Sequence, residues 1–99
     1  MSFAKLYIQS KDKADILDLV RSAINAEIVK LELASQLSNN RLMPFEQKYN
    51  ITSDYFIVNM ASEDLEGGDD EYITWAGEYK LKQRLEDKLY KLKKIDYVN

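Results

Sequence analysis

The feature that most constrains this chain is a stretch, residues 12–42, that contains neither glycine nor proline. Within it apolar side chains recur every three or four residues, which is the spacing of one face of an α-helix. Ser10 or Asp12 can cap such a helix at its start. About 29 helical residues would form a rod of roughly 43 Å. The apolar positions are Ile16, Leu17, Val20, Ile24, Ile28, Leu31, Ala34, Leu37 and Leu42.

Two features mark candidate ends of this long helix. Asn39 and Asn40 tolerate left-handed backbone geometry, so they can fray or end it. Pro44 lacks an amide hydrogen, so we expect it either to break the helix or to open the first turn of a new one.

A second helical stripe runs from about Asp70 to Asp96. Acidic residues cluster at its start and lysines at its end, which is the polarity that a helix dipole favours. The pairs Glu78–Lys82 and Asp87–Lys91 are spaced to interact along one helix face. A helix of this length would measure roughly 40 Å. Its apolar positions are Tyr72, Trp75, Tyr79, Leu85, Leu89, Leu92 and Ile95.

Shorter elements are expected before and between these helices. Residues 3–10 alternate in a period of two, which favours a short strand, although Phe3 and Tyr7 would also fit one helical turn. Asn50 can stop a helix, and Thr52 or Ser53 can cap a short helix that runs through Met60. Gly67–Gly68 allows a turn with positive backbone angles.

These segments predict a mainly α fold in a single helical domain, residues 1–99. It would be a long, coiled-coil-like two-helix hairpin with a short connecting helix and a short N-terminal strand. Two rods leave apolar surface uncovered, so we expect a homodimer that forms a helical bundle. The side chains expected to be buried at helix contacts are Val20, Ile24, Ile28, Leu31, Trp75, Tyr79, Leu85 and Leu89.

Composition argues against most enzyme classes. The chain has no histidine and no cysteine, which removes thiol nucleophiles, disulfides, Cys/His zinc sites and Ser–His pairs. We therefore expect no enzymatic activity and no cofactor. No apolar run approaches the roughly 20 residues of a membrane span, and the N-terminus lacks a signal-peptide core. These features predict a cytoplasmic protein that does not enter a membrane.

Acidic charge is concentrated in the middle of the chain. Residues 44–71 carry eight acidic residues and one basic residue, a net charge of −7 within a chain of net charge −3. Direct nucleic-acid binding is therefore not expected, and a basic protein surface is the better match. Two alternatives remain: a solvated turn that caps a helix, and a loosely held Mg²⁺ ion. The residues do not fit the spacing of a calcium EF-hand loop.

The middle of the chain also carries a recurrent pattern. It consists of a Phe-Glu-x-Lys-Tyr start at residues 45–49, a polar helix cap, Phe56, an acidic glycine turn, the paired Asp69–Asp70 and Trp75. This pattern resembles that of small, mostly uncharacterised prokaryotic proteins, common in cyanobacteria and archaea, that are described as antitoxins of toxin–antitoxin pairs. The resemblance covers roughly residues 45–92. It implies a protein that binds and blocks a toxin, often of the RNase or nuclease type, and it brings no catalytic residues.

The combined prediction is a non-enzymatic, antitoxin-like protein-binding module that neutralises a basic toxin by direct contact. The alternatives are a structural helical subunit of a larger complex without a toxin partner and, less favoured, a small metal-dependent enzyme. No metal site is predicted. The expected partner-binding residues are Glu63, Asp64, Glu66, Asp69 and Asp70, with Tyr55, Phe56 and Trp75 as aromatic anchors.

Overall fold

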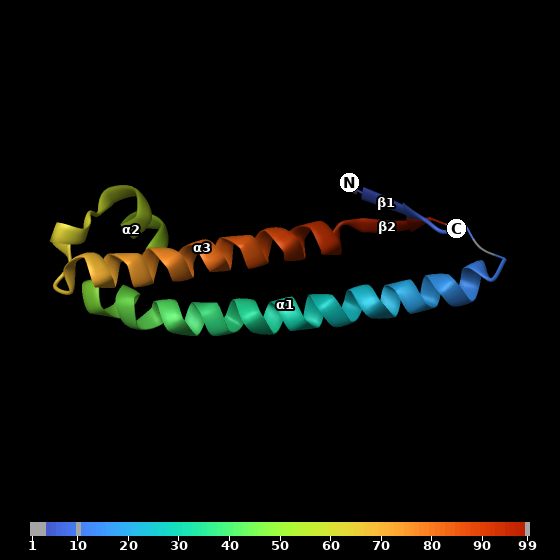
Figure 1. Cartoon of the computed structure of the whole chain (residues 1–99), viewed down its shortest axis with the longest axis horizontal. Coiled ribbons are helices and arrows are strands. Elements are labelled where there is room, and N and C mark those ends of the chain that lie inside the picture. The colour runs from blue at the N-terminus through green and yellow to red at the C-terminus, as the bar shows by residue number, and fades with distance from the viewer. Residues whose placement is uncertain (1–3, 10, 99) are drawn as a thin grey trace. The chain divides into compact units, whose positions relative to one another are not determined.

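The computed structural model describes residues 4–9 and 11–98 and is mainly helical (Figure 1). The long helices α1 and α3 run antiparallel, and a short helix lies in the connection between them. This arrangement confirms the predicted helical hairpin. In chain order the elements are β1 (Ala4–Tyr7), α1 (Lys13–Tyr49), α2 (Ser53–Asn59), the 3₁₀ turn η1 (Ser62–Asp64), α3 (Gly68–Lys93) and β2 (Ile95–Val98).

The chain packs as two compact units. Unit 1 holds the described residues of 1–34 and 85–99, and unit 2 holds residues 35–84. Unit 1 therefore contains both strands, the first part of α1 and the last part of α3. Unit 2 contains the rest of both long helices together with α2 and η1.

Helix α1 is longer than its sequence predicts. The expectations that Asn39–Asn40 end it and that Pro44 breaks it are wrong, because α1 continues through both positions to Tyr49. Proline in a helix interior forfeits one hydrogen bond. In unit 2 that loss is offset by packing, since Leu42 is buried before the proline and Phe45 packs on the same core after it.

The predicted end signals after α1 are confirmed. Asn50 adopts a positive φ of 54°, and the Ile51 amide donates to the Glu46 carbonyl at 3.2 Å, which closes the helix in a Schellman-type motif. The Thr52 hydroxyl accepts a hydrogen bond from the Tyr55 amide at 3.1 Å and so caps α2. Gly68 opens α3 with a φ of 63°, as expected for the glycine turn.

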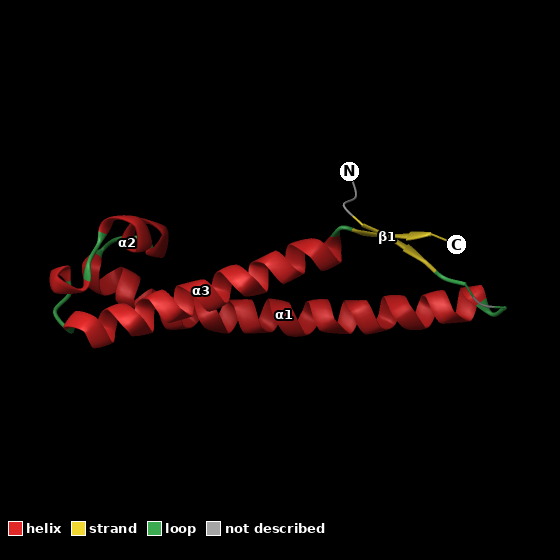
Figure 2. Cartoon of the chain, turned by 45° about the horizontal axis from the view of Figure 1, so that its top comes forward, coloured by secondary structure: helices red, strands yellow, loops and turns green. Residues whose placement is uncertain are grey.

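Unit 1 contains a strand pair that the sequence predicts only in part. β1 confirms the expected N-terminal strand, while the expected end residues Phe3 and Ser10 lie outside the described residues. β2 corrects the prediction that helix α3 extends to Asp96. It pairs parallel to β1, with Ala4 opposite Ile95 and Tyr7 opposite Val98 (Figure 2). This pairing joins residues far apart in sequence, so local periodicity could not reveal it.

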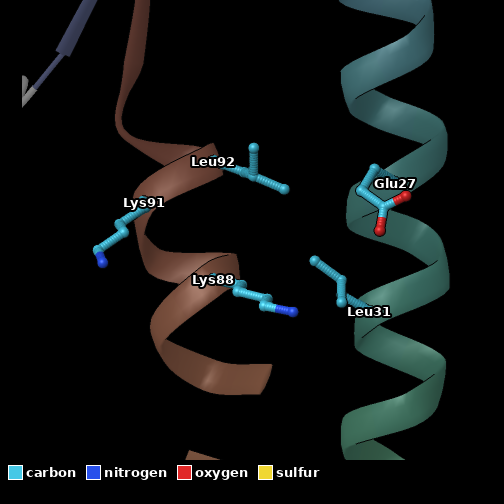
Figure 3. Close-up of a pocket in the computed structure, with 5 residues that line it drawn as sticks. All are labelled: Glu27, Leu31, Lys88, Lys91 and Leu92. Carbon is cyan, nitrogen blue, oxygen red and sulfur yellow. The ribbon is translucent and has the colours of Figure 1, made fainter. Parts of the chain in front are cut away.

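The helices of unit 1 share a modest interior. Leu17, Leu31 and Leu89 are buried, whereas Val20, Ile24, Ile28 and Leu85, which were also predicted to be buried, are only half-buried. The Arg21 guanidinium lies 4.9 Å from the centre of the Tyr97 ring, and Lys93 lies 3.9 Å from Glu32. Leu31 of α1 and Leu92 of α3 point toward each other across a groove of about 280 Å³ (Figure 3).

Candidate functional site

The interior of unit 2 is built around one indole ring. Trp75 of α3 is fully buried and lies face to face with Phe56 of α2, with ring centroids 3.8 Å apart and an interplanar angle of 1°. Phe45 and Tyr49, one turn apart on α1, stack near the same indole at centroid distances of 5.4 and 5.7 Å. Aromatic side chains from α1, α2 and α3 therefore meet at Trp75. Leu42, Leu65, Ala76 and Tyr79 complete this buried core.

A chain of hydrogen bonds ties the same helices together. The Trp75 Nε1–H group donates to the Ser53 hydroxyl at 2.8 Å. The Ser53 hydroxyl and backbone amide both donate to Glu46 Oε2, at 2.8 and 2.9 Å. Ser53 is only 3% exposed, so these bonds satisfy polar groups that water does not reach. Glu46 thereby holds the start of α2 against α1.

A second network surrounds Glu71, whose side chain is only 12% exposed. The Tyr49 hydroxyl donates a hydrogen bond to this carboxylate, Lys48 Nζ lies 2.9 Å from its Oε2 atom, and the Gly67 amide donates to its Oε1 atom at 3.1 Å. Tyr49 and then Lys48 stabilise the charged form, which lowers the pKa of Glu71 from 4.5 to about 2. The bond to Glu71 also raises the pKa of Lys48 above its ordinary value.

These networks assign structural roles to the residues that carry the resemblance. In the Phe-Glu-x-Lys-Tyr segment, Phe45 and Tyr49 stack near Trp75, Glu46 caps α2 and Lys48 pairs with Glu71. The segment therefore acts as a folding motif that closes the end of the hairpin. The spacing of Phe45 and Tyr49 by one helical turn was the sequence signal for this shared face.

The structure corrects two of the three predicted aromatic anchors. Phe56 and Trp75 are both 0% exposed, so in this fold they stabilise the core and cannot contact a partner. Tyr55 is 53% exposed and remains available. The prediction erred because Tyr55 to Val58 is an unbroken apolar run, in which the inner and outer sides of a short helix cannot be told apart from sequence.

All five predicted acidic residues are exposed at the connection between α2 and α3. Two of them also support the local fold. Asp64 accepts a hydrogen bond from the Ala61 amide at 2.9 Å, and Glu66 lies 3.4 Å from Lys48 Nζ. Asp69 and Asp70 occupy the first turn of α3, where negative charge favours the helix dipole. We call Glu63, Asp64, Glu66, Asp69 and Asp70 the acidic rim.

Sequence reasoning missed exposed apolar residues in the same unit as this rim, among them Val58 of α2 and Ile73 of α3. Val58 is 79% exposed and lies one helical turn from Tyr55 on α2. The two side chains therefore share the outer side of a helix whose inner side is anchored by Ser53 and Phe56. The sequence carries no signal that separates Val58 from its buried neighbours, because residues 55–58 are all apolar.

The structure was also searched for metal sites and for membrane-spanning helices. Across the described part of the chain, no group of three or more acidic side chains is gathered closely enough to hold a metal ion. Within the same residues, no helix is both long enough and apolar enough to cross a membrane. Comparison with known proteins gave no match to a family model, a curated protein or a solved structure.

Proposed function

We propose that this chain is a non-enzymatic protein-binding module of the cytoplasm that captures a basic partner protein through the outer side of α2 and the acidic rim. The observation that carries the proposal is that two exposed apolar side chains, Tyr55 and Val58, and the exposed acidic rim belong to the same small unit. Following the resemblance of residues 45–92, we further propose that the partner is a toxin, which binding neutralises.

Each half of this surface suits a different part of protein recognition. An exposed tyrosine and valine on a helix held rigidly from its inner side can insert into a partner at little entropic cost, and such anchors slow dissociation. Exposed carboxylates beside them draw in a positively charged partner and exclude acidic ones, which mainly speeds association. Negative charge at this surface disfavours nucleic acid as the ligand.

Catalysis is poorly supported by the same geometry. Glu71 and Lys48, the side chains with the strongly shifted pKa values, neutralise each other within the fold. A shallow groove of about 340 Å³ lies where α1 ends and α2 begins, and Glu46 is among the residues that line it. The Glu46 carboxylate already accepts two hydrogen bonds from Ser53.

The toxin proposal is tested with the product of the gene adjacent to the gene for this chain. Expression of that product alone should arrest growth, and co-expression of this chain should restore it. A neighbour that is harmless, or whose toxicity persists beside well-expressed chain, would contradict the toxin proposal.

The binding surface is tested with the same purified pair. Glu63→Gln with Glu66→Gln should slow association several-fold at low salt and flatten its salt dependence. Tyr55→Ala with Val58→Ser should mainly speed dissociation. Asp18→Asn with Glu27→Gln removes two exposed charges from unit 1 and is the matched control, which should bind as the parent does. If the control weakens binding as much as the rim variant, the partner contacts another surface.

A further inference from the structure

The groove of about 340 Å³ where α1 ends and α2 begins lies wholly within unit 2. It combines apolar and polar side chains. Met43 is 47% exposed and Ile51 is half-buried, and both offer apolar surface. The other members supply a carboxylate, two amides and a hydroxyl. We call it the α1-end groove, and its lining residues are Met43, Glu46, Gln47, Asn50, Ile51 and Thr52.

The Glu46 carboxylate has binding capacity that the fold does not use. Its Oε2 atom accepts both hydrogen bonds from Ser53, whereas its Oε1 atom accepts none from any residue that the structure describes. Among those residues, every fully buried side-chain oxygen or nitrogen has a hydrogen-bond partner. Oε1 is therefore reached by solvent, and a carboxylate oxygen can accept two hydrogen bonds. Because Glu46 lines the groove, Oε1 is an acceptor available to a ligand there.

The negative charge of Glu46 is not neutralised within unit 2. The basic residues at this end of α1 lie roughly 140–160° around the helix axis from Glu46. One of them, Arg41, pairs with Glu78 of α3. The other, Lys48, pairs with Glu71 of the same helix. The negative end of the α1 dipole adds to the charge of Glu46, because the last carbonyl groups of a helix have no intrahelical donors. The groove therefore favours a cation.

The α1-end groove adjoins the proposed binding surface on α2. Thr52 lines the groove, and its hydroxyl accepts a hydrogen bond from the Tyr55 amide at 3.1 Å. Tyr55 is one of the two exposed apolar residues on the outer side of α2. A protein seated on that side is therefore close enough to place one long side chain in the groove.

We propose that one arginine side chain of the basic partner occupies the α1-end groove, an inference that rests on the proposed function. The guanidinium group donates to Glu46 Oε1, and the apolar stem of the arginine lies on Met43 and Ile51. Arginine suits this groove better than lysine. A planar guanidinium has five donors in a fixed arrangement, and the side-chain oxygens of Gln47 and Asn50 provide acceptors beside the carboxylate.

Titration of the ¹⁵N-labelled full chain with N-acetyl-L-argininamide tests the groove without the partner. The backbone amide signals of the groove residues should shift saturably, with a dissociation constant on the order of 1 mM for so small a ligand. N-acetyl-L-citrullinamide has the same shape without the charge and should bind roughly tenfold more weakly. A parent chain without saturable shifts at the groove, or with equal affinity for both compounds, would overturn the proposal. Equal binding of N-acetyl-L-lysinamide would overturn the choice of arginine.

Two variants locate this binding in the groove. Glu46→Gln keeps an oxygen for Ser53 but removes the charge, so it should weaken argininamide binding roughly tenfold. Gln47→Glu adds a carboxylate to the same groove and should tighten binding several-fold, which keeps the test decisive if Glu46→Gln does not fold. Asp18→Asn removes an exposed charge from unit 1 and is the matched control, which should bind as the parent does. A folded Glu46→Gln variant that binds like the parent, or a Gln47→Glu variant that gains no affinity, would overturn the assignment.

The purified complex with the partner tests the identity of the occupant. Glu46→Gln should speed dissociation several-fold, and a double-mutant cycle should couple this change to one arginine of the partner. If the complex forms but no partner arginine couples to Glu46, this inference is overturned while the proposed function stands. If no complex forms, it is the proposed function that fails, and the argininamide titration then decides alone whether the groove recognises a guanidinium group.

Discussion

The indole ring of Trp75 and the phenyl ring of Phe56 lie in parallel planes, 3.8 Å apart between centroids, with both side chains fully buried. Trp75 belongs to a long helix and Phe56 to a helix of seven residues. A helix this short has little stability of its own. Its position, and with it the exposed Tyr55 and Val58, therefore depends on tertiary contacts: this stacking and the hydrogen bonds of Ser53 to Glu46 and Trp75.

Phe56→Ala should lower the free energy of unfolding of unit 2 by about 3–5 kcal/mol, because it removes a buried aromatic ring and leaves a cavity against Trp75. Trp75 is the single tryptophan of the chain, so urea titration followed by its fluorescence measures this unit directly. If Phe56→Ala does not fold, Phe56→Leu should still show a smaller loss in the same assay.

The neighbouring residue supplies the matched control. Tyr55 is half exposed, so Tyr55→Ala should change the free energy of unfolding by about 0.5 kcal/mol or less. Equal losses from the two variants would contradict the assignment of Phe56 to the inner side of α2 and Tyr55 to the outer side.

The burial of Phe56 and the exposure of its neighbour Tyr55 could not be predicted from the sequence, although much of the fold could. α1 and α3 could be predicted because their apolar residues repeat over many turns, and Asn50, Thr52 and Gly68 could be predicted because each residue type suits its own backbone role. Phe56 and Tyr55 belong to an apolar run without a period. Only the position of Trp75 on another helix decides which of the two is buried.

Long-range contacts explain the other errors. Ile95 fits the helical stripe of α3, but pairing with Ala4 at the opposite end of the sequence places it in β2. Pro44 is unfavourable in a helix, but packing of Leu42 and Phe45 into unit 2 outweighs that preference. In the candidate site, the charge of the acidic rim was visible in the sequence. The sequence placed Trp75 both among the buried helix contacts and among the partner anchors, and its burial confirms the first of these predictions.

Ser53→Ala should lower the free energy of unfolding by about 1–3 kcal/mol, because it leaves the buried Trp75 Nε1–H group without its acceptor. A double-mutant cycle with Trp75→Phe, followed by circular dichroism in urea, isolates this contribution. In the Trp75→Phe background, where the indole donor is absent, Ser53→Ala should cost less. Equal costs in both backgrounds would assign the loss to the bond between Ser53 and Glu46 instead.

The lowered pKa of Glu71 predicts how stability depends on pH. Because the folded-state pKa of about 2 lies below the ordinary value of 4.5, the unfolded chain takes up the proton first as the pH falls. The stabilisation from Glu71 is therefore complete above the ordinary value and is lost as the pH falls from about 4.5 to about 2.

Urea titrations of the parent and of Glu71→Gln across this pH range test the effect. The glutamine keeps an acceptor for Tyr49 but does not titrate. As the pH falls, the free energy of unfolding of the variant should therefore decrease less steeply than that of the parent. The difference in slope should correspond to the uptake of up to about one proton on unfolding. Glu63→Gln, at an exposed position on η1, is the control and should follow the parent curve. Parallel curves for the parent and Glu71→Gln would contradict the role of Glu71.

Pro44→Ala should raise the free energy of unfolding by about 1–3 kcal/mol, because it restores the amide donor to the carbonyl of residue 40 and relieves the clash of the proline ring with the preceding turn. Pro44 is exposed, so little packing is lost in exchange. Gln47→Ala, also exposed and one turn further along α1, is the matched control and should change stability by about 0.5 kcal/mol or less. Both are measured by urea titration with Trp75 fluorescence. A Pro44→Ala variant that is less stable than the parent would contradict this prediction, because it would show that Pro44 stabilises the fold.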